Sequence, residues 1–227
     1  MSTSRTATTG YLEHGAEQID WLLGSTPKRI AFVPYAAVRF SFEEYEAMVS
    51  GGITGHEVVS VHRFDDPLDG LKGADAIAVG GGNTFQLVRE MYRFGLMNPI
   101  REMALGGVPF IGWSAGSNVT SPRLCTTNDM PIAEPPSFST LGLISAQINP
   151  HYLDAHPDGH MGETRAERLE EFIILNPGVQ VIALREGAML KVDGDRMTLE
   201  GIAGARLFHS GSEPREFDPG ADLSFLL

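Results

Sequence analysis

The segment of this chain best suited to nucleophilic chemistry is a pentapeptide of the form G-x-S-x-G, Gly112–Gly116. It follows an apolar run that we expect to be a strand, and it precedes a predicted helix. Glycines on both sides allow a sharp strand-to-helix turn that lifts the hydroxyl of Ser114 clear of the backbone. The helix start then places N–H donors near developing negative charge. Because short patterns also arise by chance, an ordinary serine in a glycine-rich turn remains the alternative.

A second glycine-rich loop, Gly80-Gly81-Gly82-Asn83-Thr84, also lies between a predicted strand and a predicted helix. Its backbone N–H groups could bind an oxyanion or a phosphate. The loop matches neither the dinucleotide pattern nor the P-loop pattern, so nucleotide binding is weakly supported. We expect it to supply an oxyanion donor beside Ser114; the alternative is a turn that only requires positive φ.

A nucleophilic serine needs a base, and the base needs an acceptor that orients it. Of seven histidines, we take His151 as the candidate base, because it lies just after a predicted strand and ligands bind at the carboxyl ends of parallel strands. The first candidate for the acceptor is Asp129, in a polar loop shortly after the serine. Three other carboxylates rank only slightly lower: Glu134, Asp154 and Glu186.

A metal site is the rival interpretation of the histidine-rich segment. Five potential ligands fall within ten residues: His151, Asp154, His156, Asp158 and His160. The segment has none of the metallohydrolase patterns, and its proline and glycine predict a loop rather than a helix that presents ligands. We therefore expect no metal and no other cofactor.

The elements that must position these residues follow an α/β pattern, with short apolar strands alternating with amphipathic helices around a mostly parallel sheet. Strands are predicted at Ile30–Pro34, Val58–Val61, Ala76–Gly80, Val108–Gly112, Ala146–Asn149 and Val179–Leu184. Helices are predicted from Ser41, with a capping box to Glu44, through Met48, and at Thr84–Tyr92, Pro99–Ala104 and Glu163–Leu175. After Arg185 the pattern changes to hairpins, which predict a small antiparallel C-terminal appendage: Ala188–Val192, Met197–Leu199 and Ala205–His209.

Composition fits one soluble domain spanning 1–227. The chain has 227 residues, 42% of them hydrophobic, and a formal charge of −12 from 17 basic and 29 acidic side chains. This acidity disfavours nucleic acid and anionic membrane surfaces as partners. The start of the chain is polar and the apolar runs are short, so we expect a cytoplasmic protein. The single cysteine excludes an intrachain disulfide and any cluster of several cysteines.

Five segments, in this order, carry a resemblance to the peptidase E (aspartyl dipeptidase) family of serine peptidases: Val79–Leu87, Ile111–Asn118, Thr126–Ile132, Gln147–His151 and Gly159–Leu169. The resemblance implies an α/β fold similar to the class I glutamine amidotransferase domain, in three layers around a mostly parallel sheet. It also implies removal of an unblocked N-terminal aspartate from Asp-Xaa dipeptides through an aspartyl-enzyme.

Carried over to this chain, the resemblance implies a role for each matching residue. Ser114 would be the nucleophile, His151 the base and Asp129 the orienting carboxylate, with Glu186 as the alternative acid. The N–H groups of Gly82 and Ala115 would form the oxyanion hole. Arg165, with Asn83, would bind the substrate; without the resemblance, Arg165 would be a surface arginine paired with Glu163 or Glu167.

Two other functions stay open at this point. A related serine hydrolase could act on another aspartyl substrate, such as a β-aspartyl or cyanophycin-type peptide. A binding module with a decayed site is the non-enzymatic alternative, which the presence of all three triad residue types disfavours. Small peptides are the expected partners, and a homodimer is left open.

Overall fold

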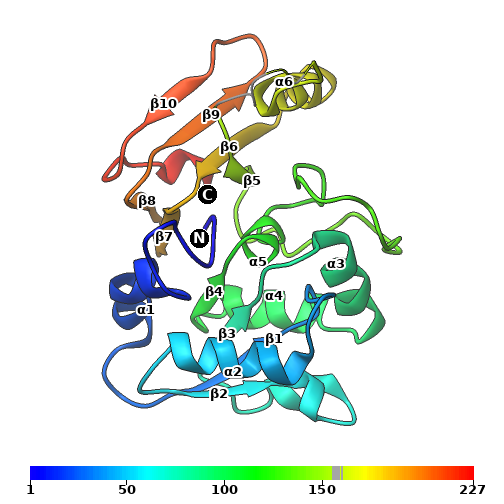
Figure 1. The fold of residues 1–227 in the computed structure, drawn as a ribbon, viewed down its shortest axis with the longest axis vertical. Coiled ribbons are helices and arrows are strands. Elements are labelled where there is room, and N and C mark those ends of the chain that lie inside the picture. Colours follow the sequence, from blue (N-terminus) through cyan, green and yellow to red (C-terminus); the bar gives the residue numbers. More distant parts are fainter. Residues whose placement is uncertain (155–158, 160) are drawn as a thin grey trace.

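The computed structural model describes residues 1–154, 159 and 161–227, and its main strands form two separate four-stranded sheets. The first sheet is parallel, in the order β2-β1-β3-β4, with bounds β1 Arg29–Val33, β2 Glu57–Ser60, β3 Ala76–Val79 and β4 Phe110–Gly112. The second sheet is mixed, in the order β10-β9-β6-β5, with bounds β5 Gln147–Tyr152, β6 Gln180–Arg185, β9 Ala205–His209 and β10 Arg215–Phe217. The two sheets occupy opposite halves of the molecule (Figure 1).

The first sheet is the middle of three layers because its strands are apolar on both faces. On one face, Ile30 and Phe32 of β1 pack against helices α1 (Ala16–Leu23) and α2 (Phe42–Gly52). On the other face, Ala31 and Val33 pack against α3 (Thr84–Arg93) and α4 (Met97–Leu105). Short 3₁₀ turns lie in this half of the chain, at Glu13–Gly15, Val61–Arg63 and Pro67–Leu71. Another, Ser224–Leu226, lies at the C-terminus.

The second sheet also has two covered faces. Val181 and Phe208 pack against α6 (Arg165–Leu175) on one side. On the other side, Ile182 and Leu207 pack against the hairpin of β7 (Ala188–Asp193) and β8 (Arg196–Gly201) and against the C-terminal residues. The chain start runs between the two halves, where Ser2 donates its N–H to the carbonyl of Ala188 (Figure 1).

The α/β class, the parallel sheet and the antiparallel C-terminal strands are confirmed, and the structure differs from expectation in one main respect. The strands at Gln147–Tyr152 and Gln180–Arg185 form a sheet of their own instead of extending the first one. Side-chain bonds, rather than a strand ladder, attach β5 to the first half. Asn118, at the end of the short helix α5 (Ala115–Asn118), donates to the carbonyl of Ile148 at 2.7 Å, and Thr126 donates to it at 2.8 Å.

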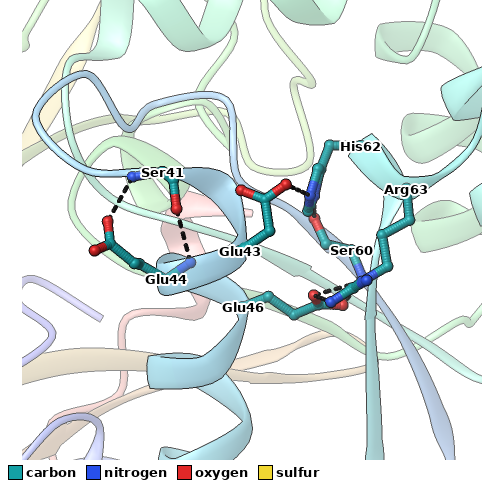
Figure 2. Close-up of polar contacts among 7 residues, drawn as sticks. All are labelled: Ser41, Glu43, Glu44, Glu46, Ser60, His62 and Arg63. Atoms are coloured by element: carbon teal, nitrogen blue, oxygen red, sulfur yellow. Dashed lines mark hydrogen bonds and ion pairs between the residues drawn. The ribbon is translucent and has the colours of Figure 1, made fainter.

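A polar cluster, which we call the α2 clasp, ties the start of α2 to the edge strand β2 (Figure 2). It consists of Glu43, Glu46, Ser60, His62 and Arg63. Glu46 accepts from the backbone N–H of Ser60 at 2.8 Å and from Nε of Arg63 at 2.6 Å. Burial alone would raise the pKa of Glu46, but these two hydrogen bonds outweigh it and hold that pKa below its ordinary value.

The remaining contacts of the α2 clasp pass through His62. Its Nε2 lies 3.2 Å from Glu43, and its Nδ1 lies 2.6 Å from the hydroxyl of Ser60. The predicted capping box is confirmed one turn earlier: the hydroxyl of Ser41 accepts from the N–H of Glu44, whose carboxylate accepts from the N–H of Ser41. The first turn of α2 is therefore held at its start by the capping box and further along by the contacts of Glu43 and Glu46 in the α2 clasp.

Candidate active site

Ser114 lies in the sharp turn between β4 and α5, as its motif predicts. Its backbone has φ 53° and ψ −114°, a conformation that L-residues rarely adopt. The two flanking glycines are required by close backbone approaches. A Cβ on Gly112 would lie 2.3 Å from the carbonyl oxygen of Gly116, and one on Gly116 would lie 1.9 Å from that of Val79.

His151 reaches Ser114 from the opposite sheet. It lies in β5, where the register with β6 shifts between Asn149 and Tyr152, and its φ is 55°. Its Nε2 lies 2.9 Å from Oγ of Ser114. The expected serine–histidine pair is thus within hydrogen-bond distance, with the two side chains supplied by different halves of the molecule.

The carboxylate beside His151 belongs to Glu186, in the turn between β6 and β7. Its Oε1 lies 3.1 Å from Nδ1 of His151. Strand order explains this placement, because β6 is hydrogen-bonded to β5 and both strands end at the same edge. The signal visible in the sequence was only that Glu186, like His151, lies just after a predicted strand.

Asp129, the acid first expected, faces the glycine-rich loop instead. Its Oδ2 accepts from the N–H of Thr84 at 2.7 Å and from the hydroxyls of Thr84 at 2.6 Å and Thr127 at 3.0 Å. Within the described part of the chain it makes no hydrogen bond to His151. The first turn of α3 leaves N–H groups without helical partners, and Asp129 satisfies one of them.

Ser2 is a site residue that the sequence analysis missed. Its buried hydroxyl donates to the carbonyl of Leu184 at 2.9 Å and accepts from the N–H of His151 at 2.9 Å. One side chain thereby joins the strand that leads to Glu186 to the backbone of His151. No local pattern could reveal this contact, since the bond to His151 spans 149 positions.

The N–H groups expected in the oxyanion hole have no protein acceptor within the described residues: those of Gly82 and Ala115 make no internal hydrogen bond. Gly82 has φ 137°, and a Cβ there would lie 2.2 Å from the carbonyl oxygen of Ala36. Asn83 caps α3: its Oδ1 accepts from the N–H of Gln86, and its Nδ2 donates to the carbonyl of Met130.

Arg165 is the first residue of α6, and it forms no ion pair with any residue that the structure describes. Burial and the neighbouring Arg168 lower its pKa, and the charge of Asp129 partly opposes them. The alternative in which Arg165 is a surface arginine paired with Glu163 or Glu167 is not observed. Glu163 pairs with Arg168 at 3.6 Å, and Glu167 accepts from the N–H of Thr164 in a capping box. The half-buried guanidinium of Arg165 therefore has no carboxylate partner among the described residues.

The described residues contain no group of three or more side chains arranged to hold a metal ion. Three members of the histidine-rich segment, His156, Asp158 and His160, lie outside the described residues. Cys125 is a half-buried free thiol whose pKa is raised by burial. In the same described ranges, none of the helices has the length and apolar character needed to cross a bilayer.

Comparison with known proteins identifies the relatives of this chain. It is 50% identical to a peptidase E of Streptomyces coelicolor, over all of this chain and 93% of that protein. It is 45% identical to a peptidase E of Shewanella denitrificans, over all of this chain and 97% of that protein. A crystal structure of a peptidase from an acI-B1 Actinobacterium shares the fold, with a TM-score of 0.65, 19% identity and coverage of 94% of this chain and 92% of that one.

A second solved structure, a putative peptidase E from Listeria monocytogenes, has a TM-score of 0.60 and 24% identity over 79% of this chain and 89% of its own. The model of peptidase family S51 matches residues 1–200. The family match and the whole-length relatives agree with the serine elbow and with the histidine placed against it. The chain belongs to peptidase family S51 and is a serine-type peptidase.

Proposed function

We propose that this peptidase removes an unblocked N-terminal aspartate from Asp-Xaa dipeptides and acts in the cytoplasm. The observation that carries the proposal is the chain of contacts from Oγ of Ser114 through the imidazole of His151 to Glu186, at 2.9 and 3.1 Å. A hydroxyl, an imidazole and a carboxylate in this order are the parts needed for acyl transfer.

In the proposed reaction, Nε2 of His151 takes the proton from Oγ of Ser114 as that oxygen attacks the carbonyl carbon of the aspartyl residue. The imidazolium then gives this proton to the leaving amine. A water molecule, deprotonated by His151 in the same way, hydrolyses the aspartyl-enzyme and restores the Ser114 hydroxyl. Nδ1–H donates to Glu186 throughout, so the tautomer that leaves Nε2 free is the favoured one.

Of the two carboxylates considered for the triad, we propose Glu186 as the one that orients His151. It lies within hydrogen-bond distance of Nδ1, whereas Asp129 accepts three hydrogen bonds around Thr84. Asp129 then has a different task, which is to hold the start of α3 and the loop that precedes it. Its negative charge also acts on Arg165.

The N–H groups of Gly82 and Ala115 are the proposed oxyanion donors, supported by their lack of a protein acceptor in the described ranges. Arg165 is the proposed partner of the aspartyl side chain. A guanidinium binds a carboxylate with two parallel hydrogen bonds, and a neutral side chain would leave this half-buried charge unpaired. Asn83 is the weaker candidate for substrate binding, because the oxygen and the nitrogen of its side-chain amide already have partners inside the protein.

The test is hydrolysis of Asp-Leu in the presence of EDTA, with Glu-Leu and Leu-Leu as control substrates. We expect selective cleavage of Asp-Leu, and a loss on the order of 10⁴–10⁶ in kcat for Ser114→Ala. Arg165→Met tests the aspartyl pocket, and Arg168→Met is its control on the same helix. We expect only the first to lower kcat/KM for Asp-Leu, on the order of 10²–10³-fold.

Other outcomes would redirect the proposal. A folded enzyme whose Ser114 reacts with a fluorophosphonate but which does not cleave Asp-Leu would refute the dipeptide substrate. β-Aspartyl and cyanophycin-type peptides would then be the next substrates to assay. Strong inhibition by EDTA would contradict the serine mechanism and return attention to the histidine-rich segment.

A further inference from the structure

The glycine-rich loop beside Ser114 accepts a hydrogen bond from one buried phenol. The hydroxyl of Tyr45, on α2, donates to the carbonyl oxygen of Gly81 at 2.9 Å. The same hydroxyl accepts from the indole Nε1 of Trp113 at 3.2 Å. Trp113 is the residue immediately before Ser114, so this short chain of hydrogen bonds connects the two loops on which the proposed mechanism depends.

The carbonyl that Tyr45 holds belongs to the same peptide unit as the N–H of Gly82. The described chain has no cis peptide bond, so this N–H points opposite to the carbonyl of Gly81 and away from Tyr45. A Cβ on Gly81 would lie 2.9 Å from Cβ of Ser114, so the peptide unit runs directly beside the nucleophile. The direction of one oxyanion donor is thus set by the hydrogen bond on its opposite side.

Each glycine of the loop accommodates a different part of this arrangement. A Cβ on Gly80 would lie 2.5 Å from the hydroxyl oxygen of Tyr45, and one on Gly82 would meet the carbonyl of Ala36. Gly81 leaves room for Ser114. The loop can therefore pass between the phenol and the nucleophile only because it has no side chains.

The phenol itself is held firmly. Tyr45 is 2% exposed and packs edge-to-face against Phe32, with ring centroids 4.9 Å apart. Burial raises its pKa, so the hydroxyl stays a donor over the working pH range. Its helix is fixed on either side of it by the capping box and the α2 clasp (Figure 2).

We propose that Tyr45, oriented by Trp113, is a positioning residue that fixes the Gly81–Gly82 peptide plane, so that the N–H of Gly82 stabilises the oxyanion. The inference rests on the proposed acyl transfer at Ser114. A donor that is fixed before the reaction stabilises developing charge without any reorganisation. A peptide unit that is free to tilt must first be reoriented, which costs energy. The hydrogen bond from Tyr45 also polarises the peptide unit and makes its N–H a stronger donor.

The test compares Tyr45→Phe with the matched variant Tyr92→Phe. Tyr92 also donates to a backbone carbonyl, that of Ser139 at 2.9 Å, but this hydrogen bond is exposed and does not involve the glycine-rich loop. We expect Tyr45→Phe to lower kcat for Asp-Leu about 10- to 100-fold with little change in KM, because one oxyanion donor is worth about 10²–10³ and here it is misaligned rather than lost. Tyr92→Phe should retain the wild-type kcat.

An aspartate analogue with a boronic acid in place of the scissile carbonyl separates positioning from general damage. It forms a tetrahedral adduct with Ser114 that uses the oxyanion donors. β-Alanine keeps the amine and the side-chain carboxylate of aspartate but has no carbonyl carbon at the scissile position, so it does not use these donors. The affinity of Tyr45→Phe for the boronate should fall by the same factor as kcat, while its affinity for β-alanine stays unchanged. A parallel fall in both affinities, or no change in kcat, would overturn the inference.

Two further measurements keep this inference separable from the proposed substrate. The rate at which a fluorophosphonate labels Ser114 depends on the oxyanion donors but not on the peptide. If the wild type does not cleave Asp-Leu, equal labelling rates for the wild type and Tyr45→Phe would still refute the role of Tyr45. Trp113→Phe, which leaves the phenol in place, should show a smaller loss of the same kind if Tyr45→Phe fails to fold.

Discussion

The proposed nucleophile and the proposed base both adopt backbone conformations that cost energy. Ser114 and His151 have φ 53° and 55°, and side chains other than glycine seldom occupy that region. Each is retained by hydrogen bonds on its own backbone: the N–H of Ser114 donates to the carbonyl of Met1, and that of His151 donates to Ser2. The first two residues of the chain therefore hold the geometry of the candidate site.

The roles of the two acidic residues can be distinguished by neutral isosteres. Glu186→Gln should lower kcat on the order of 10²–10⁴-fold, because an amide does not stabilise the imidazolium and can favour the wrong tautomer of His151. Asp129→Asn should lower kcat by less than about tenfold, since its amide oxygen can still accept from Thr84. Steady-state kinetics with Asp-Leu gives both values. The opposite ranking would restore Asp129 as the acid of the triad.

Residue types brought out the serine and histidine that the structure places within hydrogen-bond distance, but they did not rank Glu186, which lies beside His151, ahead of Asp129. Ser114 and His151 each follow a strand, and that local signal is visible in the sequence. The distinction between Asp129 and Glu186 depends on which strand lies beside β5, which is information about pairing and not about composition. Ser2 and Tyr45 are harder still, because their contacts join segments far apart in the chain.

At the level of elements, α2 connects the surface of the molecule to the candidate site. The helix carries Glu43 and Glu46, which contact the residues of β2 and the turn after it in the α2 clasp (Figure 2). It also carries Tyr45, which is buried in the core. The capping box at Ser41 was visible in the sequence because it is a local pattern. The α2 clasp was not, because it requires β2 to lie beside the helix.

Glu46→Gln should destabilise the protein at neutral pH by about 2 kcal/mol, through loss of a charged hydrogen bond with Arg63. For a chain of this size, that change lowers Tm by roughly 4–8 °C. Because the folded-state pKa of Glu46 is depressed, its contribution is present above the ordinary glutamate pKa and disappears as the pH falls through the folded value.

Thermal melting at a series of pH values tests this expectation. The difference in Tm between the wild type and Glu46→Gln should be largest near pH 7 and should shrink below about pH 4. Glu102→Gln, at an exposed glutamate of α4, is the control and should melt like the wild type at every pH. A difference that grows on acidification would contradict the assignment.

The whole molecule consists of two sheets, each with its own covering layers, and the candidate site lies where they meet (Figure 1). Periodicity predicted all but one of the strands, β10, but could not show that β4 and β5 do not pair. Nothing in a strand's own apolar pattern says which neighbour it will have. The attachment of β5 through Asn118, Ser121 and Thr126 is a tertiary feature made by isolated polar side chains.

Asn118→Ala should therefore affect activity more than stability. The carbonyl of Ile148 keeps its bond from Thr126, so we expect a loss of only about 1–2 kcal/mol in the free energy of unfolding. A small displacement of His151 from Ser114 should still lower kcat about tenfold or more. Urea unfolding and kinetics give the two values. Asn176→Ala removes a similar bond, to the carbonyl of Phe172 at the end of α6, and is the control.

The division of the candidate site between two sheets bears on how the enzyme is made. Ribosomal synthesis delivers the first sheet and Ser114 before any of the second sheet. His151, the proposed base, follows 37 positions later, and Glu186 another 35 positions after that. Under the proposed mechanism, a growing chain therefore carries Ser114 before the group that would deprotonate it. We expect peptide cleavage to begin only after the second sheet has been translated and has docked.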